Sequence, residues 1–253
     1  MPKVIVITGA GSGLGRALAR RLAADGDTVV LLGRTLAKLE AVVAEIGGRA
    51  MAVSCDVGSA DAVRGAFAVI SARFRTIDVL INNAATVEHF LVAEATDEQI
   101  VGTLTTNLIG PVLCTRAAMS IMSRGGQIFN VSSGAVEQHF PGLSLYSSSK
   151  AGLERFSLSM HRELQSRNIS VTIVRAGQMI EDDHTWERGS ATVRLADTLA
   201  AFGLDPRRRP SSRFVSVTDA FRAMIDLPAD LSSDLICLRP QEASGLSPQR
   251  PTP

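Results

Sequence analysis

The chain has 253 residues, of which 45% are hydrophobic and 20% are charged, and its formal net charge is +1. This balance fits a protein with a substantial buried core and gives no support to a polyanion-binding surface or an acidic partner. No apolar stretch approaches the roughly 18 residues needed to cross a bilayer, and the first residues lack the features of a signal peptide. We therefore expect a cytoplasmic protein without nucleic-acid or membrane partners.

Strand and helix patterns alternate from the first residues onward. In chain order, the predicted elements are strand 3–7, helix 14–26, strand 28–32, helix 35–48, strand 50–55, helix 59–74, strand 78–82, helix 96–123, strand 127–131, helix 145–167, strand 169–175, helix 219–227 and strand 234–240. Aliphatic and β-branched strands separated by helices indicate an α/β fold, in which helices cover both faces of a parallel sheet.

The chain is predicted to form one domain over residues 1–240. Nothing before residue 177 resembles a linker. Residues 178–213 are polar and have no clear period, and a long irregular segment in a compact domain is often a functional lid. Residues 241–253 are rich in Pro and Ser, which predicts a flexible tail.

Three cysteines stand at Cys55, Cys114 and Cys237, and their spacing does not match a metal site. We expect reduced thiols that act as small core residues rather than as nucleophiles. No metal site is predicted.

A glycine-rich loop, TGAGSGLG at residues 8–15, joins the first strand to the first helix. Its spacing is T-G-x-x-x-G-x-G and does not fit G-x-G-x-x-G. Glycines at this turn let a pyrophosphate approach the backbone N–H groups at the helix N-terminus, although a plain strand-to-helix turn remains the alternative. The predicted cofactor contacts in this loop are Gly9, Ser12, Gly13, Leu14 and Gly15.

The residue that reads the adenosine ribose is expected at the end of the second strand, where the sequence is Gly33-Arg34-Thr35. A carboxylate there would bind a free 2′-hydroxyl, whereas a guanidinium forms charge-assisted bonds to a 2′-phosphate. Arg34 and Thr35 therefore predict NADP(H) in preference to NAD(H). The alternative is that Arg34 simply begins a solvated helix.

Tyr146, the only tyrosine in the chain, precedes Lys150 by four residues on a predicted helix. Residues i and i+4 share a helix face, and an ammonium beside a phenol favours the phenolate, which lowers the phenol pKa. Ser133 follows the strand 127–131, at the sheet edge where ligands bind in open α/β folds. These three side chains predict a proton-transfer site.

These features together resemble the short-chain dehydrogenase/reductase family along nearly the whole chain. The matching features, in the family's order and spacing, are TGAGSGLG (8–15), CDV (55–57), NNAA (82–85), Asn107, VSS (131–133) and YSSSK (146–150). The resemblance implies a Rossmann-like, doubly wound, mostly parallel seven-stranded sheet with strand order 3-2-1-4-5-6-7. It also implies hydride transfer between a nicotinamide and a ketone or secondary alcohol of a small molecule.

The resemblance further implies roles for single residues. Tyr146 would be the general acid in reduction and the base in oxidation, Lys150 would lower its pKa and hold the nicotinamide ribose, and Ser133 would hydrogen-bond the reacting oxygen. Asn107 would complete a water-mediated proton path to Lys150, with an ordinary kink or surface residue as the alternative. Tyr146 and Lys150 count as cofactor contacts too, and the others implied are Asp56, Val57, Asn83, Ala84 and Gly177.

The sequence departs from the family pattern at several positions. Ala85 replaces a usual glycine, and Arg175-Ala176-Gly177 keeps only the glycine of the usual Pro-Gly. Glu181 stands where a threonine usually contacts the nicotinamide carboxamide, so Gln178 is the candidate for that contact. The ending LICLRPQ (235–241) resembles members with a final Arg-Pro strand, many of them NADP-linked reductases.

Within the predicted lid, Trp186 is a candidate substrate contact, with packing of the lid as the alternative. His184 is not accompanied by the further side chains that a metal site would need. The arginines 207–209 either attract an anionic group of the substrate or form part of a solvated loop. A non-catalytic dinucleotide-binding sensor or scaffold is the competing function, but it would not need Ser133, Tyr146 and Lys150. An epimerase or dehydratase usually needs a longer C-terminal substrate domain. The family resemblance implies a homodimer or homotetramer built through helices 96–123 and 145–167.

Overall fold

The structure, a computed structural model, describes residues 2–181, 196, 197, 199–201, 205 and 209–241. The strands are β1 Val4–Thr8, β2 Thr28–Gly33, β3 Ala50–Ser54, β4 Ile77–Asn82, β5 Met122–Ser133, β6 Ser170–Ala176, β7 Met179–Ile180, β8 Ser212–Arg213 and β9 Leu235–Leu238. The α-helices are α1 Gly13–Ala24, α2 Leu36–Ile46, α3 Ala60–Arg73, α4 Asp97–Leu104, α5 Gly110–Met119, α6 Ser144–Leu164 and α8 Phe214–Ile225. Shorter helical turns are η1 Val92–Glu94, η2 Thr105–Ile109, η3 Gly134–Glu137 and η4 Gln165–Arg167.

In the described part of the chain, seven parallel strands form one sheet with the order β3-β2-β1-β4-β5-β6-β9. The predicted fold class and strand order are thereby confirmed, with β9 as the seventh strand. The chain first runs outward from β1 through β2 to β3 and then returns to β4 on the other side of β1. This reversal between β1 and β4 leaves a crevice at the carboxyl ends of the strands, where ligands bind in such folds.

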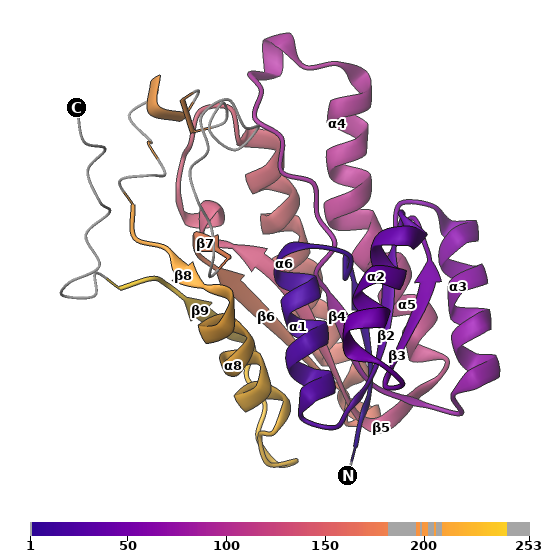
Figure 1. The fold of residues 1–253 in the computed structure, drawn as a ribbon. Coiled ribbons are helices and arrows are strands. Elements are labelled where there is room, and N and C mark those ends of the chain that lie inside the picture. Colours follow the sequence, from indigo (N-terminus) through magenta and orange to yellow (C-terminus); the bar gives the residue numbers. More distant parts are fainter. Residues whose placement is uncertain (1, 182–195, 198, 202–204, 206–208, 242–253) are drawn as a thin grey trace.

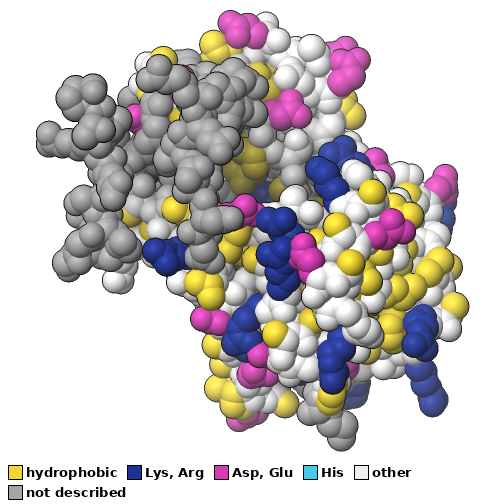
Figure 2. All heavy atoms as spheres, in the orientation of Figure 1, with side chains coloured by type: hydrophobic (Ala, Val, Ile, Leu, Met, Phe, Trp, Pro, Cys, Tyr) yellow, Lys and Arg dark blue, Asp and Glu magenta, His cyan; other side chains and the backbone are white. Residues whose placement is uncertain are grey.

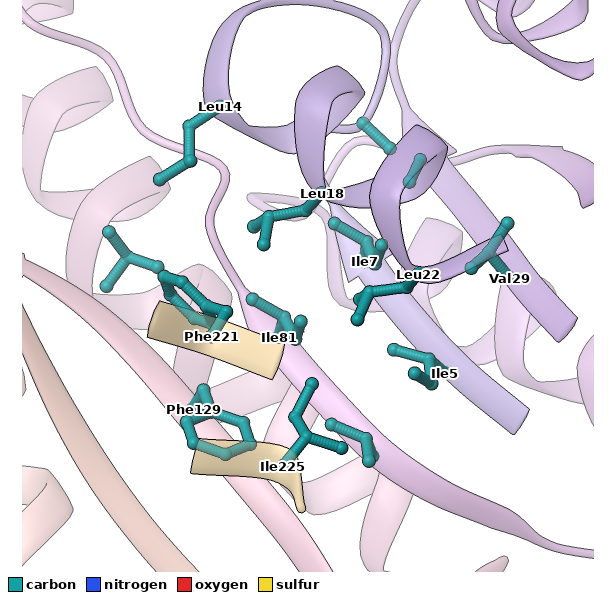
Figure 3. Close-up of a cluster of buried hydrophobic side chains, with 14 of the residues drawn as sticks. Ile5, Ile7, Leu14, Leu18, Leu22, Val29, Ile81, Phe129, Phe221 and Ile225 are labelled. Carbon is teal, nitrogen blue, oxygen red and sulfur yellow. The ribbon is translucent and has the colours of Figure 1, made fainter. Parts of the chain in front are cut away.

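Helices cover both faces of the sheet (Figure 1). Because side chains alternate along a strand, Ile5 and Ile7 of β1 pack under α1, α2 and α8, whereas Val6 packs under α3, α5 and α6. Figure 3 shows the first of these clusters, in which Phe129 of β5 meets Phe221 of α8 edge to face with ring centroids 5.8 Å apart. This apolar layer holds α1 and α8 against the sheet and fixes the direction in which the glycine loop faces.

The predicted helix 96–123 is wrong at its centre and at its end. α4 begins after Thr96, whose side chain and that of Gln99 form a reciprocal capping box. One π turn, η2, interrupts the helix at residues 105–109, and α5 ends at Met119. Met122 then pairs with Ile77 as the start of β5, because its buried side chain completes the core on the α3, α5 and α6 face.

Several smaller predictions also need correction. α8 begins at Phe214 rather than at residue 219, and the predicted lid contributes a short parallel pair, β7 with β8. Cys55 and Cys114 are buried as predicted, but Cys237 is exposed on the edge strand β9. Burial raises the pKa of Cys55 to about 11.

The surface combines charges of both signs. Figure 2 shows acidic and basic side chains interspersed over the face that it draws, in keeping with the net charge of +1. None of the helices in the described ranges is both long enough and apolar enough to pass through a bilayer. Among the same residues, no three His, Cys, Asp or Glu side chains gather as a metal site would require.

Candidate active site

A cleft of about 290 Å³ opens at the carboxyl ends of β1, β2, β3 and β4, at the point where the strand order reverses. The lining residues are Gly9, Gly11, Ser12, Gly33, Arg34, Thr35, Lys38, Leu39, Cys55, Asp56, Val57, Asn83, Ala84, Ala85, Thr86 and Thr106. Most of these residues follow the ends of four neighbouring strands, and α2 and the π turn η2 supply the others.

The glycine loop approaches its neighbours more closely than any side chain would allow. Gly9 has a φ of +69°, and a Cβ there would lie 2.8 Å from the Cα of Ala84. A Cβ at Gly15 would lie 2.8 Å from the carbonyl carbon of Gly9, inside van der Waals contact. Bare backbone therefore faces the cleft at the N-terminus of α1, which is the arrangement that accepts a pyrophosphate.

Side-chain hydrogen bonds join this loop to the end of β4. The Thr8 hydroxyl accepts from the backbone N–H groups of Asn83 at 3.0 Å and of Ala84 at 2.9 Å. The Asn83 amide donates to the Thr8 carbonyl at 3.0 Å. Asn83 and Thr8 thus fix the two strand ends that border the switch point, and Asn83 lines the cleft while doing so.

Two cations stand at the β2 end of the cleft. Arg34 follows β2, Lys38 lies on the first turn of α2, and both side chains are exposed while lining the cleft. Asp56, the only carboxylate among the described residues of the lining, follows β3, and its Oδ1 accepts from the Gly58 N–H at 3.0 Å. Positive charge therefore borders the position at which an adenosine ribose would lie.

A second group of polar side chains lies where β5 ends and α6 begins. The ammonium of Lys150 donates to the Val131 carbonyl at 2.7 Å and lies 6.0 Å from the centroid of the Tyr146 ring. The Ser133 hydroxyl accepts from the Ala135 N–H at 3.2 Å and is hydrogen-bonded to the Tyr146 side chain. The structure thus brings together three of the four predicted catalytic side chains.

Burial is the main cause of the pKa shifts of Tyr146 and Lys150. It raises the pKa of Tyr146 above its ordinary value, while the hydrogen bond with Ser133 acts in the opposite direction. The predicted lowering of the Tyr146 pKa by Lys150 is therefore wrong for this arrangement, because Lys150 itself is only 2% exposed and points its ammonium at the Val131 carbonyl. Desolvation lowers the pKa of Lys150 from 10.5 to about 8.

Asn107, the fourth predicted catalytic residue, lies fully buried in the π turn η2. Its side chain accepts from the Thr86 N–H at 2.8 Å and donates to the Thr86 carbonyl at 2.9 Å. It also donates to the Ser149 hydroxyl at 3.2 Å, and Ser149 donates to the Tyr146 carbonyl at 2.7 Å. Asn107 therefore links the cleft lining at Thr86 to the helix that carries Tyr146.

Comparison with known proteins decides the family. The sequence profile described as short chain dehydrogenase matches residues 3–190. The chain belongs to this family. It is an oxidoreductase of the short-chain type, and the family binds NAD(P).

Curated members of the family align over most of this chain. A 3-oxoacyl-acyl-carrier-protein reductase from Synechocystis sp. is 34% identical over 224 residues, which cover 86% of this chain and 90% of that protein. Carbonyl reductase family member 4 from Danio rerio is 32% identical over 229 residues, covering 90% and 91%. A short chain dehydrogenase from Burkholderia cenocepacia, solved in complex with NADP, superposes with a TM-score of 0.79 at 26% identity and covers 94% and 96%.

The cofactor residues predicted for this family member fall into two groups. Those that line the cleft are Gly9, Ser12, Arg34, Thr35, Asp56, Val57, Asn83 and Ala84. Those outside its lining are Gly13, Leu14, Gly15, Gly177, Tyr146 and Lys150. Leu14 packs into the apolar cluster of α1, and Gly177 packs against Pro240, whose Cδ would lie 2.8 Å from a Cβ there.

The departures from the family pattern also have structural counterparts. Glu181, which stands at the usual threonine position, forms an ion pair with Arg16 of α1 at 2.6 Å. Gln178 donates to the Ser211 hydroxyl at 2.9 Å and so joins β7 to the segment before β8. Trp186, His184, Arg207 and Arg208 lie outside the described residues. Arg209 lies over the Phe140 ring, 5.0 Å from its centroid.

Sequence reasoning missed some residues of the site. Lys38 is the most informative of them, since it adds a second cation to the lining that contains Arg34. Its position four residues after Arg34 could have indicated this, because the first turn of α2 borders the same strand end. Thr86 and Thr106 also line the cleft. Their positions depend on the path of the chain after β4 and on the π turn, which no local pattern indicates.

Lys150→Met is expected to change how stability depends on pH. Between the folded pKa of about 8 and the ordinary value of 10.5, the unfolded wild type binds more protons than the folded wild type, so its stability rises with pH through that window. The methionine variant has no ionisable group at this position, so it lacks this pH-dependent contribution to stability. From pH 7 to pH 10, the free energy of unfolding of the wild type should therefore rise by about 2 kcal/mol relative to that of the variant.

Urea unfolding of both proteins at the two pH values measures this difference. Lys38→Met, at an exposed position, controls for the substitution itself. A wild-type-minus-variant difference that stays constant with pH would contradict the buried, desolvated Lys150.

Proposed function

We propose that the protein is an NADP(H)-dependent oxidoreductase that interconverts a ketone and a secondary alcohol of a small molecule, with Tyr146 as the general acid and base. The observation that carries this proposal is the cluster of Ser133, Tyr146 and Lys150 at the end of β5. Hydrogen bonds through Ser149 and Asn107 join its helix to Thr86 in the cleft lining. A sensor or scaffold would bind a dinucleotide without such a cluster, and its hydroxyl, phenol and ammonium therefore favour catalysis.

The residues of this chain divide the work between binding and proton transfer. Bound NADP(H) supplies or accepts the hydride. The bare backbone of the glycine loop holds the pyrophosphate, and Ser133 donates a hydrogen bond to the reacting oxygen. Because burial raises the Tyr146 pKa, the phenol stays protonated near neutral pH and donates its proton to the carbonyl oxygen in reduction. Lys150, partly charged around pH 8, holds the nicotinamide ribose.

The proposed preference for NADP(H) rests on Arg34 and Lys38. Two cations at the end of β2 attract a 2′-phosphate, and no carboxylate stands at the predicted ribose position after β2. The complex of the Burkholderia cenocepacia relative with NADP supports the same preference.

Arg34→Ala is expected to raise KM for NADPH by about 30-fold, because one or two charge-assisted hydrogen bonds to the phosphate are lost. KM for NADH should stay within about 2-fold, since NADH has no 2′-phosphate for Arg34 to bind. Arg49→Ala is the matched control. It removes the same charge at the amino-terminal end of β3, away from the carboxyl ends that form the cleft, where Arg49 donates to the Gly26 carbonyl at 2.6 Å. Equal losses for both cofactors would remove the preference.

Steady-state oxidation of NADPH with a panel of small ketones tests the activity itself, and oxidation of the matching alcohols tests the reverse direction. Tight binding of NADPH without turnover of any substrate in either direction would favour the sensor or scaffold. We further propose that residues 1–240 act as one unit, in which the segment 178–213 covers the substrate.

A homodimer or homotetramer through α4, α5 and α6 is part of the proposal. Exposed apolar side chains on these helices support it, namely Val101 at 60% and Leu158 at 41% exposure, and Ile109 in η2 at 47% exposure. Burying such side chains is favourable, and helix faces of this kind commonly pair between subunits.

A further inference from the structure

A largely buried ion pair joins α6 to β6 one helical turn beyond Lys150. Glu154 of α6 and Arg175 of β6 form a forked pair, with Arg175 Nε 2.9 Å from Glu154 Oε1 and Nη2 2.5 Å from Oε2. Both side chains are 12% exposed. A buried ion pair is often no more stabilising than an apolar pair of similar volume, because both charges must be desolvated. Stability alone is therefore a weak reason for a charged pair at this place.

The carboxylate of this pair binds the end of β5 to α6. The Ser132 hydroxyl donates to Glu154 Oε1 at 2.6 Å. Ser132 directly precedes Ser133, and Glu154 lies one helical turn after Lys150, whose ammonium binds the Val131 carbonyl at 2.7 Å. Two successive turns of α6 are thus bound to two successive residues of β5, which fixes the register between the strand and the helix.

The guanidinium of Arg175 binds the turn η3, which follows Ser133. Arg175 is the register partner of Ser132 across β5 and β6, and its Nη1 donates to Glu137 Oε1. Glu137 ends the short turn η3, which begins with Ser133 as its N-cap. Arg239 donates to the other oxygen of Glu137 at 2.6 Å. Hydrogen bonds with Glu154 and nearby negative charge raise the Arg175 pKa, so the guanidinium stays charged.

We propose that Glu154 and Arg175 are positioning residues that set the Ser133 hydroxyl against the Tyr146 phenol, acting through Ser132 on one side and through η3 on the other. The catalytic consequence rests on the function proposed above, whereas the positioning of Ser133 does not. If the pair is loosened, the hydrogen bond between Ser133 and the phenol weakens. Because that bond lowers the Tyr146 pKa, the pKa then rises further.

The single tyrosine of the chain makes this measurable without any substrate. Ultraviolet absorbance of the tyrosinate, recorded against pH together with circular dichroism to mark the folded range, reports Tyr146 alone. Arg175→Lys keeps the charge and loses the fork, and Glu154→Gln keeps the shape and loses the charge. Each should raise the Tyr146 pKa by roughly half a unit or more, as Ser133→Ala should. In each variant, kcat for ketone reduction should fall about 10-fold while KM for NADPH stays within about 2-fold.

Two comparisons separate positioning from a merely structural role. Arg175→Lys in the Ser133→Ala background should add little to the pKa, because both changes act on the same hydrogen bond. Arg222→Lys is the matched control, since Arg222 and Asp27 form an equally buried pair, 14% and 7% exposed, between α8 and the residue before β2. It should leave the titration unchanged. Ser132→Ala keeps both charges and should also raise the pKa, so it tests the link if the ion-pair variants do not fold.

Unchanged Tyr146 titration in Ser132→Ala and in the ion-pair variants, or a shift that adds fully to that of Ser133→Ala, would overturn the proposal. If the Tyr146 pKa shifts in these variants but the wild type reduces no ketone, the positioning role stands and the proposed function is wrong.

Discussion

Tyr146→Phe is expected to lower kcat/KM for ketone reduction by about 10³-fold, the usual contribution of a well-placed general acid. The phenol is protonated at neutral pH, since burial raises its pKa, whereas the Lys150 ammonium is directed at the Val131 carbonyl. Reduction should therefore fall as the pH approaches the Tyr146 pKa, and alcohol oxidation should rise over the same range. The phenylalanine variant should lose both pH dependences.

The binding of NADPH should change little in this variant, since the ring itself is kept. Ser148→Ala, which removes an exposed hydroxyl two residues away on α6, controls for substitution in this helix and should retain full activity. Retention of activity within about 3-fold by Tyr146→Phe would show that another group supplies the proton.

Gly15→Ala is expected to weaken binding of NADPH at least about 10-fold, with an equal loss in kcat/KM. The added Cβ would lie 2.8 Å from the Gly9 carbonyl carbon and 2.7 Å from the Asn83 amide nitrogen, and backbone on one side of this contact cannot rotate away. The glycine loop must then move from the N-terminus of α1, at a cost of about 1–3 kcal/mol. Cofactor titration followed by fluorescence and thermal unfolding measure the two effects.

Gly65→Ala is the matched control for this substitution. Gly65 lies in α3, its φ is not positive, and a Cβ there would meet no atom within 4 Å. An alanine at that position should raise stability by roughly 0.5–1 kcal/mol through its better helix propensity. Normal NADPH affinity in Gly15→Ala would contradict the close approach of the glycine loop and α1.

The fold could be predicted from the sequence because its strands are buried on both faces. Aliphatic runs such as residues 28–32 read as strands without any partner in view, and the helices between them require parallel connections. The boundaries that failed depend on tertiary contacts. Met122 has a helical neighbourhood in sequence but pairs with Ile77, and the first turn of α8 depends on packing of Phe214 against the apolar cluster on the α1 face.

The site was predictable where chemistry is local to a strand end. Arg34, Asp56 and Asn83 each follow a strand, and the carboxyl ends of parallel strands meet at one edge. The ion pair of Glu154 and Arg175 was not predictable, because the two residues stand 21 positions apart and meet only when β6 lies beside β5 under α6. The direction of the Tyr146 pKa was likewise set by burial, which a sequence motif does not report.

A crystal structure of the enzyme with NADP⁺ bound would test both the proposed catalytic cluster and the proposed cofactor preference, since one electron-density map shows both ends of the cofactor. We expect the nicotinamide ring beside the Tyr146 phenol and the Ser133 hydroxyl, and the 2′-phosphate beside Arg34 and Lys38. A nicotinamide bound away from Tyr146, or a 2′-phosphate bound away from Arg34 and Lys38, would contradict it.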